Sequence, residues 1–202
     1  MTEKINLRSY CLIDNMQPQY SAMTGTVAQG DIPLAGMAQL FIEVAPGSEV
    51  FSMMNIALKS SNVRPGFQIV EREFGLLEVH ATSIDEIQTA GSAIIEEYNL
   101  NLQDLEPPKI VSSQLISNVD AYQAQLINRF RQGSLLVPGQ CLFILEVEPA
   151  VNIALACNNA EKASDINLVH YDPVGRFGRL YLSGSEAQIR SARDAAMEAI
   201  DN

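Results

Sequence analysis

Residues 39–46 read QLFIEVAP, and residues 142–149 read LFILEVEP. Each stretch is a run of mainly apolar residues that ends in Glu-Val-x-Pro, and the second begins 103 residues after the first. A short apolar run bounded by a turn residue is typical of a strand that is buried in a sheet. The chain therefore contains the same buried strand twice.

The repeat extends outward from these strands in both directions. With the same offset and without a gap, the two halves align from about residue 7 to the C-terminus. The identical pairs include Asn15 with Asn118, Gly30 with Gly133, Gly36 with Gly139, Lys59 with Lys162, and Phe74-Gly75 with Phe177-Gly178. Repeats of about 20–50 residues indicate solenoids or propellers, whereas a repeat of about 100 residues indicates a whole domain used twice.

The boundary between the copies is predicted near residues 100–108. Pro107 and Pro108 cannot continue a helix and favour an extended linker. We therefore predict one domain over residues 1–99 and a second over residues 109–202, joined by the linker 100–108. Each domain is large enough for a core of its own.

Both copies show the pattern of a mixed α+β unit. In the first copy, strands are expected at 7–13, 39–44, 68–72 and 76–81, with helices at about 48–61 and 84–98. In the second copy, strands are expected at 110–119, 142–147, 166–171 and 179–182, with helices at 150–163 and after Ser185. Ser83 with Glu86, and Ser185 with Gln188, have the spacing of a capping box. Each unit is therefore predicted to be an antiparallel-rich sheet with two helices packed on it.

Composition excludes several classes of partner. The net charge of -11 argues against nucleic acid and against an anionic membrane surface. No run of 18 apolar residues is present, so we expect no membrane span, and the polar N-terminus is not typical of a signal peptide. The three cysteines lack metal-ligand spacing and are interpreted as reduced thiols of a cytoplasmic protein.

The sequence also lacks the usual signatures of catalysis. No phosphate-binding glycine loop, dinucleotide fingerprint, zinc-protease motif or nucleophile elbow occurs. The two histidines, His80 and His170, occupy non-equivalent places in the two copies, and a lone histidine is more often structural than catalytic. We therefore expect no enzyme activity, no catalytic residue, no cofactor and no metal site.

The copies differ most clearly just before the shared Phe-Gly pair. Residues 70–75 read VEREFG in the first copy, whereas residues 173–178 read PVGRFG in the second. Glu71 and Arg72 thus align with Val174 and Gly175. On its own, an acid beside a base at a hairpin tip indicates a solvated turn. In a symmetric ring, the same pair could lie at the axis, bond between subunits when closed and line a polar hole when open.

Several motifs together resemble the bacterial microcompartment shell domain. They are Pro149-Ala150, the run Asn158-Asn159-Ala160-Glu161-Lys162-Ala163 and the strand Phe177-Gly178-Arg179-Leu180. The first copy has the less regular forms Pro46-Gly47, Lys59-Ser60-Ser61 and Phe74-Gly75. The segments 7–38 and 110–137, expected to be strand-rich and placed ahead of the Pro-helix motif, resemble the circularly permuted, tandem-domain subclass. Within that subclass, Val63-Arg64-Pro65-Gly66 and Lys109-Ile110-Val111-Ser112 are similar to carboxysome shell proteins.

The resemblance implies a structural shell protein with a central pore. Three chains would form a homotrimer, a pseudohexagonal tile with six shell domains, and two such trimers would stack. Glu71 and Arg72 would line a gated pore on the threefold axis. Our hypothesis is that this pore passes small anionic metabolites larger than bicarbonate, such as sugar phosphates. Lys59 and Lys162 would meet other shell proteins at the tile edge. The residues flanking the pore would be Glu73, Phe74, Gly75, Val174, Gly175, Arg176, Phe177 and Gly178.

Two alternatives stay open at the level of sequence. The first is a small-molecule sensor built from paired α+β modules, with a ligand between the copies. The second is a hydrolase or transferase with a site that no motif reveals, against which the missing catalytic residues argue.

Overall fold

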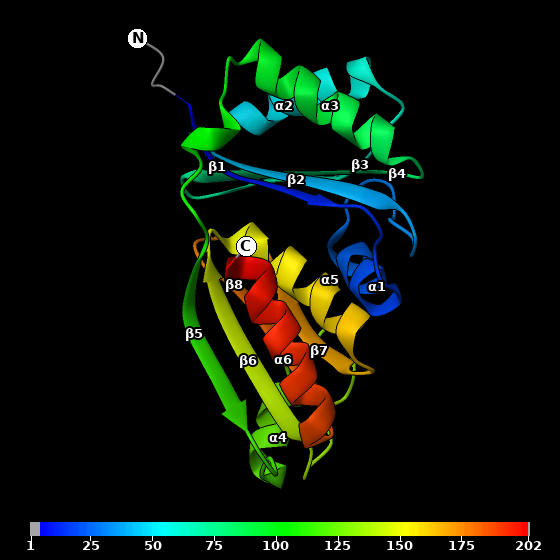
Figure 1. The fold of residues 1–202 in the computed structure, drawn as a ribbon, viewed down its shortest axis with the longest axis vertical. Helices are drawn as coiled ribbons and strands as arrows, with labels where there is room; N and C mark the ends of the chain where they lie inside the picture. Colours follow the sequence, from blue (N-terminus) through cyan, green and yellow to red (C-terminus); the bar gives the residue numbers. More distant parts are fainter. Residues whose placement is uncertain (1–4, 202) are drawn as a thin grey trace. The chain divides into compact units, whose positions relative to one another are not determined.

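The computed structural model describes residues 5–201 and divides into two compact units between Pro107 and Pro108 (Figure 1). Unit 1 is the part before this point, and unit 2 is the part after it. Both units have the α+β composition that the sequence predicts, with a four-stranded sheet in each.

Unit 1 contains four strands and three α-helices within its described residues. In chain order, the elements are β1 (Asn6–Ile13), α1 (Pro18–Val27), β2 (Ala38–Ala45), α2 (Glu49–Ser60), β3 (Arg64–Glu71), β4 (Phe74–Ala81) and α3 (Ile84–Glu97). A 3-10 turn, Leu102–Asp104, follows α3. The segment that was expected to be an extended linker is therefore partly ordered, and its Leu100 and Leu105 pack against the core of unit 1.

Unit 2 repeats this order within its described residues. Its elements are β5 (Lys109–Ile116), α4 (Ala121–Asn128), β6 (Cys141–Glu148), a 3-10 turn (Ala150–Asn152), α5 (Ile153–Ala163), β7 (Asn167–Asp172), β8 (Gly178–Gly184) and α6 (Glu186–Asp201). The helix that was predicted from residue 150 therefore opens with a 3-10 turn, and its regular part begins three residues later.

The two sheets have the same topology and register. Their strand orders are β1-β2-β4-β3 and β5-β6-β8-β7, and all neighbours are antiparallel. Leu12 pairs with Leu40 in unit 1, and Leu115 pairs with Phe143 at the equivalent place in unit 2. The peptide bonds before Pro46 and Pro149 are both cis. The structure thus preserves the repeat down to the pairing of individual residues.

The main core of unit 1 lies between one face of its sheet and the helices α2 and α3 (Figure 1). Because side chains alternate across a strand, Leu40, Ile42 and Val44 of β2 point to this face. They are fully buried and belong to the same cluster as Met53 of α2 and Ile87 of α3. The expected packing of the apolar helix stripes on the sheet is confirmed.

The helices α1 and α4 were not predicted. The segments 7–38 and 110–137 were expected to be strand-rich, but each holds one strand followed by one helix. Neither helix has a long apolar stripe, because the buried face of α1 includes the polar Ser21 and Thr24, and that of α4 consists of Ala124 and Ile127 alone. Two local signals were present: Pro18 stands at the start of α1, and Asp120 caps α4 by accepting a hydrogen bond from the backbone N–H of Tyr122.

The capping boxes are formed in one unit and only half formed in the other. In α6, the backbone N–H of Ser185 donates to Oε1 of Gln188 at 3.0 Å, and the backbone N–H of Gln188 donates to Oγ of Ser185 at 3.4 Å. In α3, Ser83 caps the helix through Asp85, but the carboxylate of Glu86 accepts from the backbone N–H of Asn62 at 2.8 Å. Glu86 therefore fastens the α2–β3 connection.

Candidate functional site

The predicted pore residues lie together at the tip of the β3–β4 hairpin in unit 1. Glu71 ends β3 and pairs with Phe74, the first residue of β4, so that Arg72 and Glu73 form a two-residue turn. Glu71, Arg72 and Glu73 are all exposed. One hairpin thus presents three charged side chains at a single point.

The backbone of Arg72 adopts a conformation that side chains disfavour. Its φ is +56°, in the left-handed region, and the aligned residue of unit 2 is Gly175 with a φ of +97°. A left-handed conformation costs a residue with a side chain about 1–2 kcal/mol, whereas glycine adopts it freely. Unit 1 therefore keeps an arginine where the backbone favours glycine, and such exceptions concentrate at functional sites.

Glu71 and Arg72 form a loose ion pair that can rearrange. Nε of Arg72 lies 3.7 Å from Oε1 of Glu71, and the side chains are 91% and 52% exposed respectively. An ion pair exposed to water contributes little to stability, so exchanging this partner for another requires little free energy. Arg72 and Glu73 also line an open cavity of about 660 Å³, together with residues 45–48 ahead of α2.

The base of the hairpin is held firmly. A Cβ at Gly75 would clash with the carbonyl oxygen of Gly47, so only glycine lets the turn before α2 approach β4 this closely. The guanidinium of Arg8 lies 3.8 Å from the ring centre of Phe74 and donates to Oε1 of the buried Glu43 at 2.7 Å. The charged side chains of the tip are therefore exposed, while the base of the hairpin is fixed by packing.

In the aligned β7–β8 loop of unit 2, the arginine is bound to a glutamate outside the loop. Nε of Arg176 donates to Oε1 of Glu148, the last residue of β6, at 3.1 Å, and its guanidinium lies 5.1 Å from the ring centre of Phe177. The backbone N–H of Val174 donates to the side chain of Asp172 at 3.1 Å. As in unit 1, a Cβ at Gly178 would clash with a backbone carbonyl, here that of Ala150.

The two predicted edge lysines occupy equivalent places. Lys59 lies in the last turn of α2 and Lys162 in the last turn of α5, and both are exposed. A cation there interacts favourably with the negative end of the helix dipole. The structure therefore places both lysines at exposed helix ends, on elements other than the pore hairpin.

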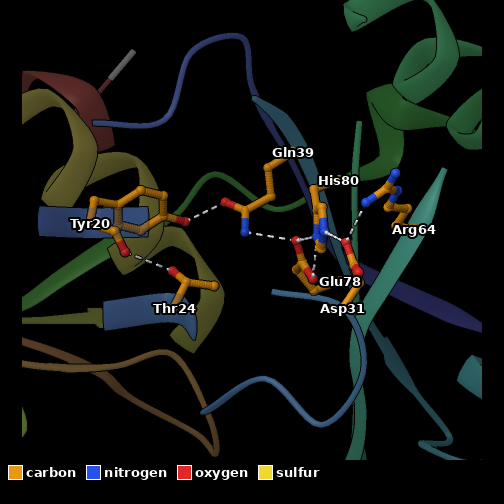
Figure 2. A network of polar contacts seen from close by, with 7 residues as sticks. All are labelled: Tyr20, Thr24, Asp31, Gln39, Arg64, Glu78 and His80. Carbon is orange, nitrogen blue, oxygen red and sulfur yellow. Dashed lines mark hydrogen bonds and ion pairs between the residues drawn. The ribbon is translucent and has the colours of Figure 1, made fainter. Parts of the chain in front are cut away.

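A buried polar network on the second face of the unit 1 sheet was not predicted (Figure 2). Its centre is His80 of β4, which lies 3.1 Å from Oε1 of Glu78 through Nδ1 and 3.2 Å from Oδ2 of Asp31 through Nε2. Gln39 of β2 donates to Glu78 at 2.9 Å and accepts from the hydroxyl of Tyr20 at 2.6 Å. The side chains of His80 and Glu78 are both fully buried.

The charges of the network alter two pKa values in opposite directions. Burial alone would lower the pKa of His80, but the hydrogen bonds and charges of Glu78 and then Asp31 raise it above its usual value. The hydrogen bond from His80, followed by that from Arg64 at 3.2 Å, lowers the pKa of Asp31. The arrangement thus favours a protonated His80 between two carboxylates.

The repeat contained a signal for this network. At the positions aligned with Gln39, Glu78 and His80, the second copy has Leu142, Tyr181 and Ser183. In unit 2, Leu142 belongs to an apolar cluster under α4, and Tyr181 packs against its edge. The two copies thus differ at three positions on one face of two neighbouring strands, which indicates a polar site that only the first copy has.

Neither a candidate metal cluster nor a candidate membrane span is found in the described part of the chain. Among residues 5–201, no group of three or more His, Cys, Asp or Glu side chains could hold a metal ion. Within the same range, no helix combines the length and the apolar character that crossing a membrane requires.

Comparisons with known proteins agree with the fold and with the repeat. Residues 7–104 match the family model of the CsoS1D N-terminal domain. The carboxysome shell protein CcmP of Synechococcus elongatus is 49% identical over 198 residues, which cover 98% of this chain and 93% of that protein.

Two solved structures have the same architecture. The fused permuted hexameric shell protein MSM0275 of the RMM microcompartment is 42% identical, with a TM-score of 0.94 and 96% of each chain covered. The double ringed trimeric shell protein MSM0271 of the same microcompartment is 33% identical, with a TM-score of 0.93, and the match covers 97% of this chain and 96% of that one. This chain belongs to the family of tandem-domain, permuted bacterial microcompartment shell proteins that includes CcmP and CsoS1D.

Proposed function

We propose that this chain is a structural tile of the carboxysome shell. The observation that carries the proposal is the match along 98% of the chain to a carboxysome shell protein that is 49% identical. The relatives are named as shell proteins, which favours a tile over a sensor or an enzyme.

Three chains would form each tile. Because the two units have the same topology and register, three copies of the chain supply six nearly equivalent units around a threefold axis. One solved relative is described as a fused hexameric shell protein and another as double ringed and trimeric. A pseudohexagonal trimer that stacks in pairs, and that borders other shell proteins, fits both descriptions.

Assembly is the first test of the tile. We expect light scattering on the full chain to give the mass of three or six chains, and electron microscopy to show hexagonal particles. Because the pore proposal requires a threefold axis, a monomer or dimer without a hexagonal outline would contradict it.

The pore of this tile would be lined by Glu71 and Arg72. Three Glu-Arg pairs near the axis would leave the constriction about neutral when paired, and rotation of exposed side chains would open it without unfolding the backbone. The guanidinium groups would then face the passing solute, which favours small anions such as sugar phosphates. The aligned loops of unit 2 would add no such charges at the axis, because they carry Val174 and Gly175 instead.

Substitution of the pore arginine tests the gate. Arg72→Ala should widen the hole seen by electron microscopy and reduce the preference for anions in a shell permeability assay, because the closing side chain and its charge are lost. The control is Arg190→Ala, which removes an exposed arginine from α6, away from both hairpin tips, and should leave the hole unchanged. An unchanged pore and unchanged permeability in Arg72→Ala would contradict the assignment.

The edge role of Lys59 and Lys162 has a separate test. Lys162→Glu should abolish flat sheets of tiles in electron micrographs while leaving the trimer mass intact, since the substitution reverses a charge at an exposed helix end. Lys59→Glu should have the same effect. Sheets that persist in both variants would show that other side chains form the tile edge.

A further inference from the structure

The loop between α1 and β2 lies along the open edge of the unit 1 sheet. Strand β3 is one of the two edge strands, and the loop adds three backbone hydrogen bonds to it. Gln29 and Gly30 both donate to the carbonyl of Gly66 at 2.8 Å, and Asp31 donates to the carbonyl of Pro65 at 2.9 Å. The residues that follow include Ile32 and Leu34, each 60% exposed, so these bonds also position two apolar side chains. We refer to residues 29–34 as the unit 1 strap.

Side chains fasten the same strap through charge. Oδ2 of Asp31 accepts from Nη1 of Arg64 at 3.2 Å and lies 3.2 Å from Nε2 of His80. Behind His80, the buried carboxylate of Glu78 lies 3.1 Å from Nδ1. Both ring nitrogens of one histidine therefore face carboxylates (Figure 2).

This geometry determines what each protonation state of His80 can do. A charged imidazolium donates one N–H to Glu78 and the other to Asp31, and both contacts are attractive. A neutral imidazole has one N–H, so one carboxylate must then face a ring lone pair. Because Glu78 also accepts from Gln39 and is fully buried, the contact with the partly exposed Asp31 is the one that can open.

Besides the two carboxylates, the side chains that face His80 from the neighbouring strands are one arginine and one uncharged amide. Arg64 of β3 lies directly across the sheet from His80 and pairs with Asp31. On the other side, β2 presents the uncharged amide of Gln39, whose oxygen accepts from Tyr20 of α1. The balance of charge at the strap therefore depends on the single proton of His80.

Unit 2 fastens the equivalent strap without a titratable group. Residues 132–137 are aligned with the unit 1 strap, and we refer to them as the unit 2 strap. The amide of Asn128 donates to the carbonyl of Leu136 at 2.8 Å, and its oxygen accepts from the backbone N–H of Leu136 at 2.9 Å. Gly25 occupies the position of Asn128 in unit 1, and Ser134 and Ser183 occupy the positions of Asp31 and His80 in unit 2.

We propose that His80, Glu78 and Asp31 form a proton-operated latch on the unit 1 strap. When His80 is charged, it links the strap to the buried carboxylate of Glu78. When it loses its proton, through the partly exposed Asp31 to water, the link to Asp31 breaks and the strap opens more often. The latch is a property of unit 1 itself and does not depend on the assembly of a tile.

The pH at which the latch operates follows from the sign of the shift. The pKa of His80 is raised, so the charged form persists above the ordinary histidine value of about 6.5. The link is fully present below that value and is lost as the pH rises through the raised pKa. The strap should therefore loosen as the pH rises through the raised pKa of His80.

Hydrogen exchange on the full-length protein tests the latch directly. Exchange rates of the amides of residues 29–31 would be measured between pH 6 and 9 and divided by their intrinsic rates. We expect protection in the unit 1 strap to fall by about tenfold or more over this range, since one proton is linked to opening. Residues 132–134 of the unit 2 strap, in the same sample, should show no such fall.

Three variants make the test specific. Asp31→Asn changes only a partly exposed side chain, so it should fold, and its unit 1 strap should have low protection at every pH. His80→Ser introduces the residue that the second copy uses, and it should give the same result. Asn128→Ala is the matched control, because it should release the unit 2 strap equally at every pH.

Either of two exchange results would overturn the latch. One is protection of residues 29–31 that stays constant between pH 6 and 9 in the unmodified chain. The other is a parallel fall in the two straps, which would assign the effect to the whole molecule. Titration of the two histidine rings by NMR supplies a second readout, and a His80 that is neutral at pH 6 would contradict the proposal as well.

Discussion

Arg72 carries its charged side chain on a left-handed backbone conformation that favours glycine. We expect Arg72→Gly to stabilise the chain by about 0.5–1 kcal/mol, because relief of the left-handed conformation exceeds the entropy that glycine loses on folding. The measurement is the urea midpoint of the full-length protein at constant pH and salt.

The control for this prediction lies in the second copy. Gly175→Ala should destabilise the chain by about 1–2 kcal/mol, because it imposes a side chain on a residue with a φ of +97°. If Arg72→Gly instead lowered the midpoint, contacts of the Arg72 side chain would have to outweigh the backbone effect.

At the scale of elements, the two capping motifs should behave differently in a double-mutant cycle. Ser185 and Gln188 bond reciprocally, so Ser185→Ala should cost about 1 kcal/mol, and its effect should shrink once Gln188 is already alanine. Ser83 and Glu86 act on different groups, so their single-variant effects should add. Unfolding of the four variants of each pair checks this, and equal coupling in both pairs would contradict it.

The elements also show what the sequence could and could not predict. Strands β2 and β6 and helices α2 and α5 followed from apolar spacing, because burial of one face imposes a period on the residues. Helices α1 and α4 did not, since their short segments mix polar and apolar residues around the helix. Gly25 lies inside α1 and disfavours a helix, so the local signal for this helix in the sequence is Pro18 at its start.

Of the two candidate sites, the sequence predicted one and missed the other. The charged tip was predictable, because Glu71, Arg72 and Glu73 are adjacent in the chain and depart from the second copy. The latch was not predicted, because Asp31 and His80 are distant in sequence and meet only when β3 and β4 pair at the sheet edge. A role for such residues depends on strand register, which apolar spacing alone leaves undetermined.

For the whole molecule, the two histidines predict opposite responses to pH. The pKa of His80 is raised, so unit 1 should lose stability as the pH rises through that pKa. Burial lowers the pKa of His170, so unit 2 should lose stability as the pH falls below about 6.5 and through that lowered pKa. Hydrogen exchange of β4 and β8 in one sample, from pH 5 to 9, would follow both units.

A variant in the second unit isolates this effect. His170→Phe introduces the residue that the first copy has at the aligned position, Phe67, and should remove the loss of stability of unit 2 in acid. Two units that respond to pH in the same direction would show that other groups dominate their titration.

The ion pairs of two equivalent glutamates, Glu43 and Glu146, limit how freely parts of this chain can be exchanged. Both glutamates occupy the same place in the repeat, yet Glu43 is paired with Arg8 of β1, whereas Glu146 is paired with Arg179 of β8, each at 2.7 Å. A chimera that replaced β1 by β5 would remove the ion pair between Arg8 and the buried Glu43, which should destabilise unit 1. The interchangeable module is thus the complete unit, because recombination within a unit would separate the two members of such an ion pair.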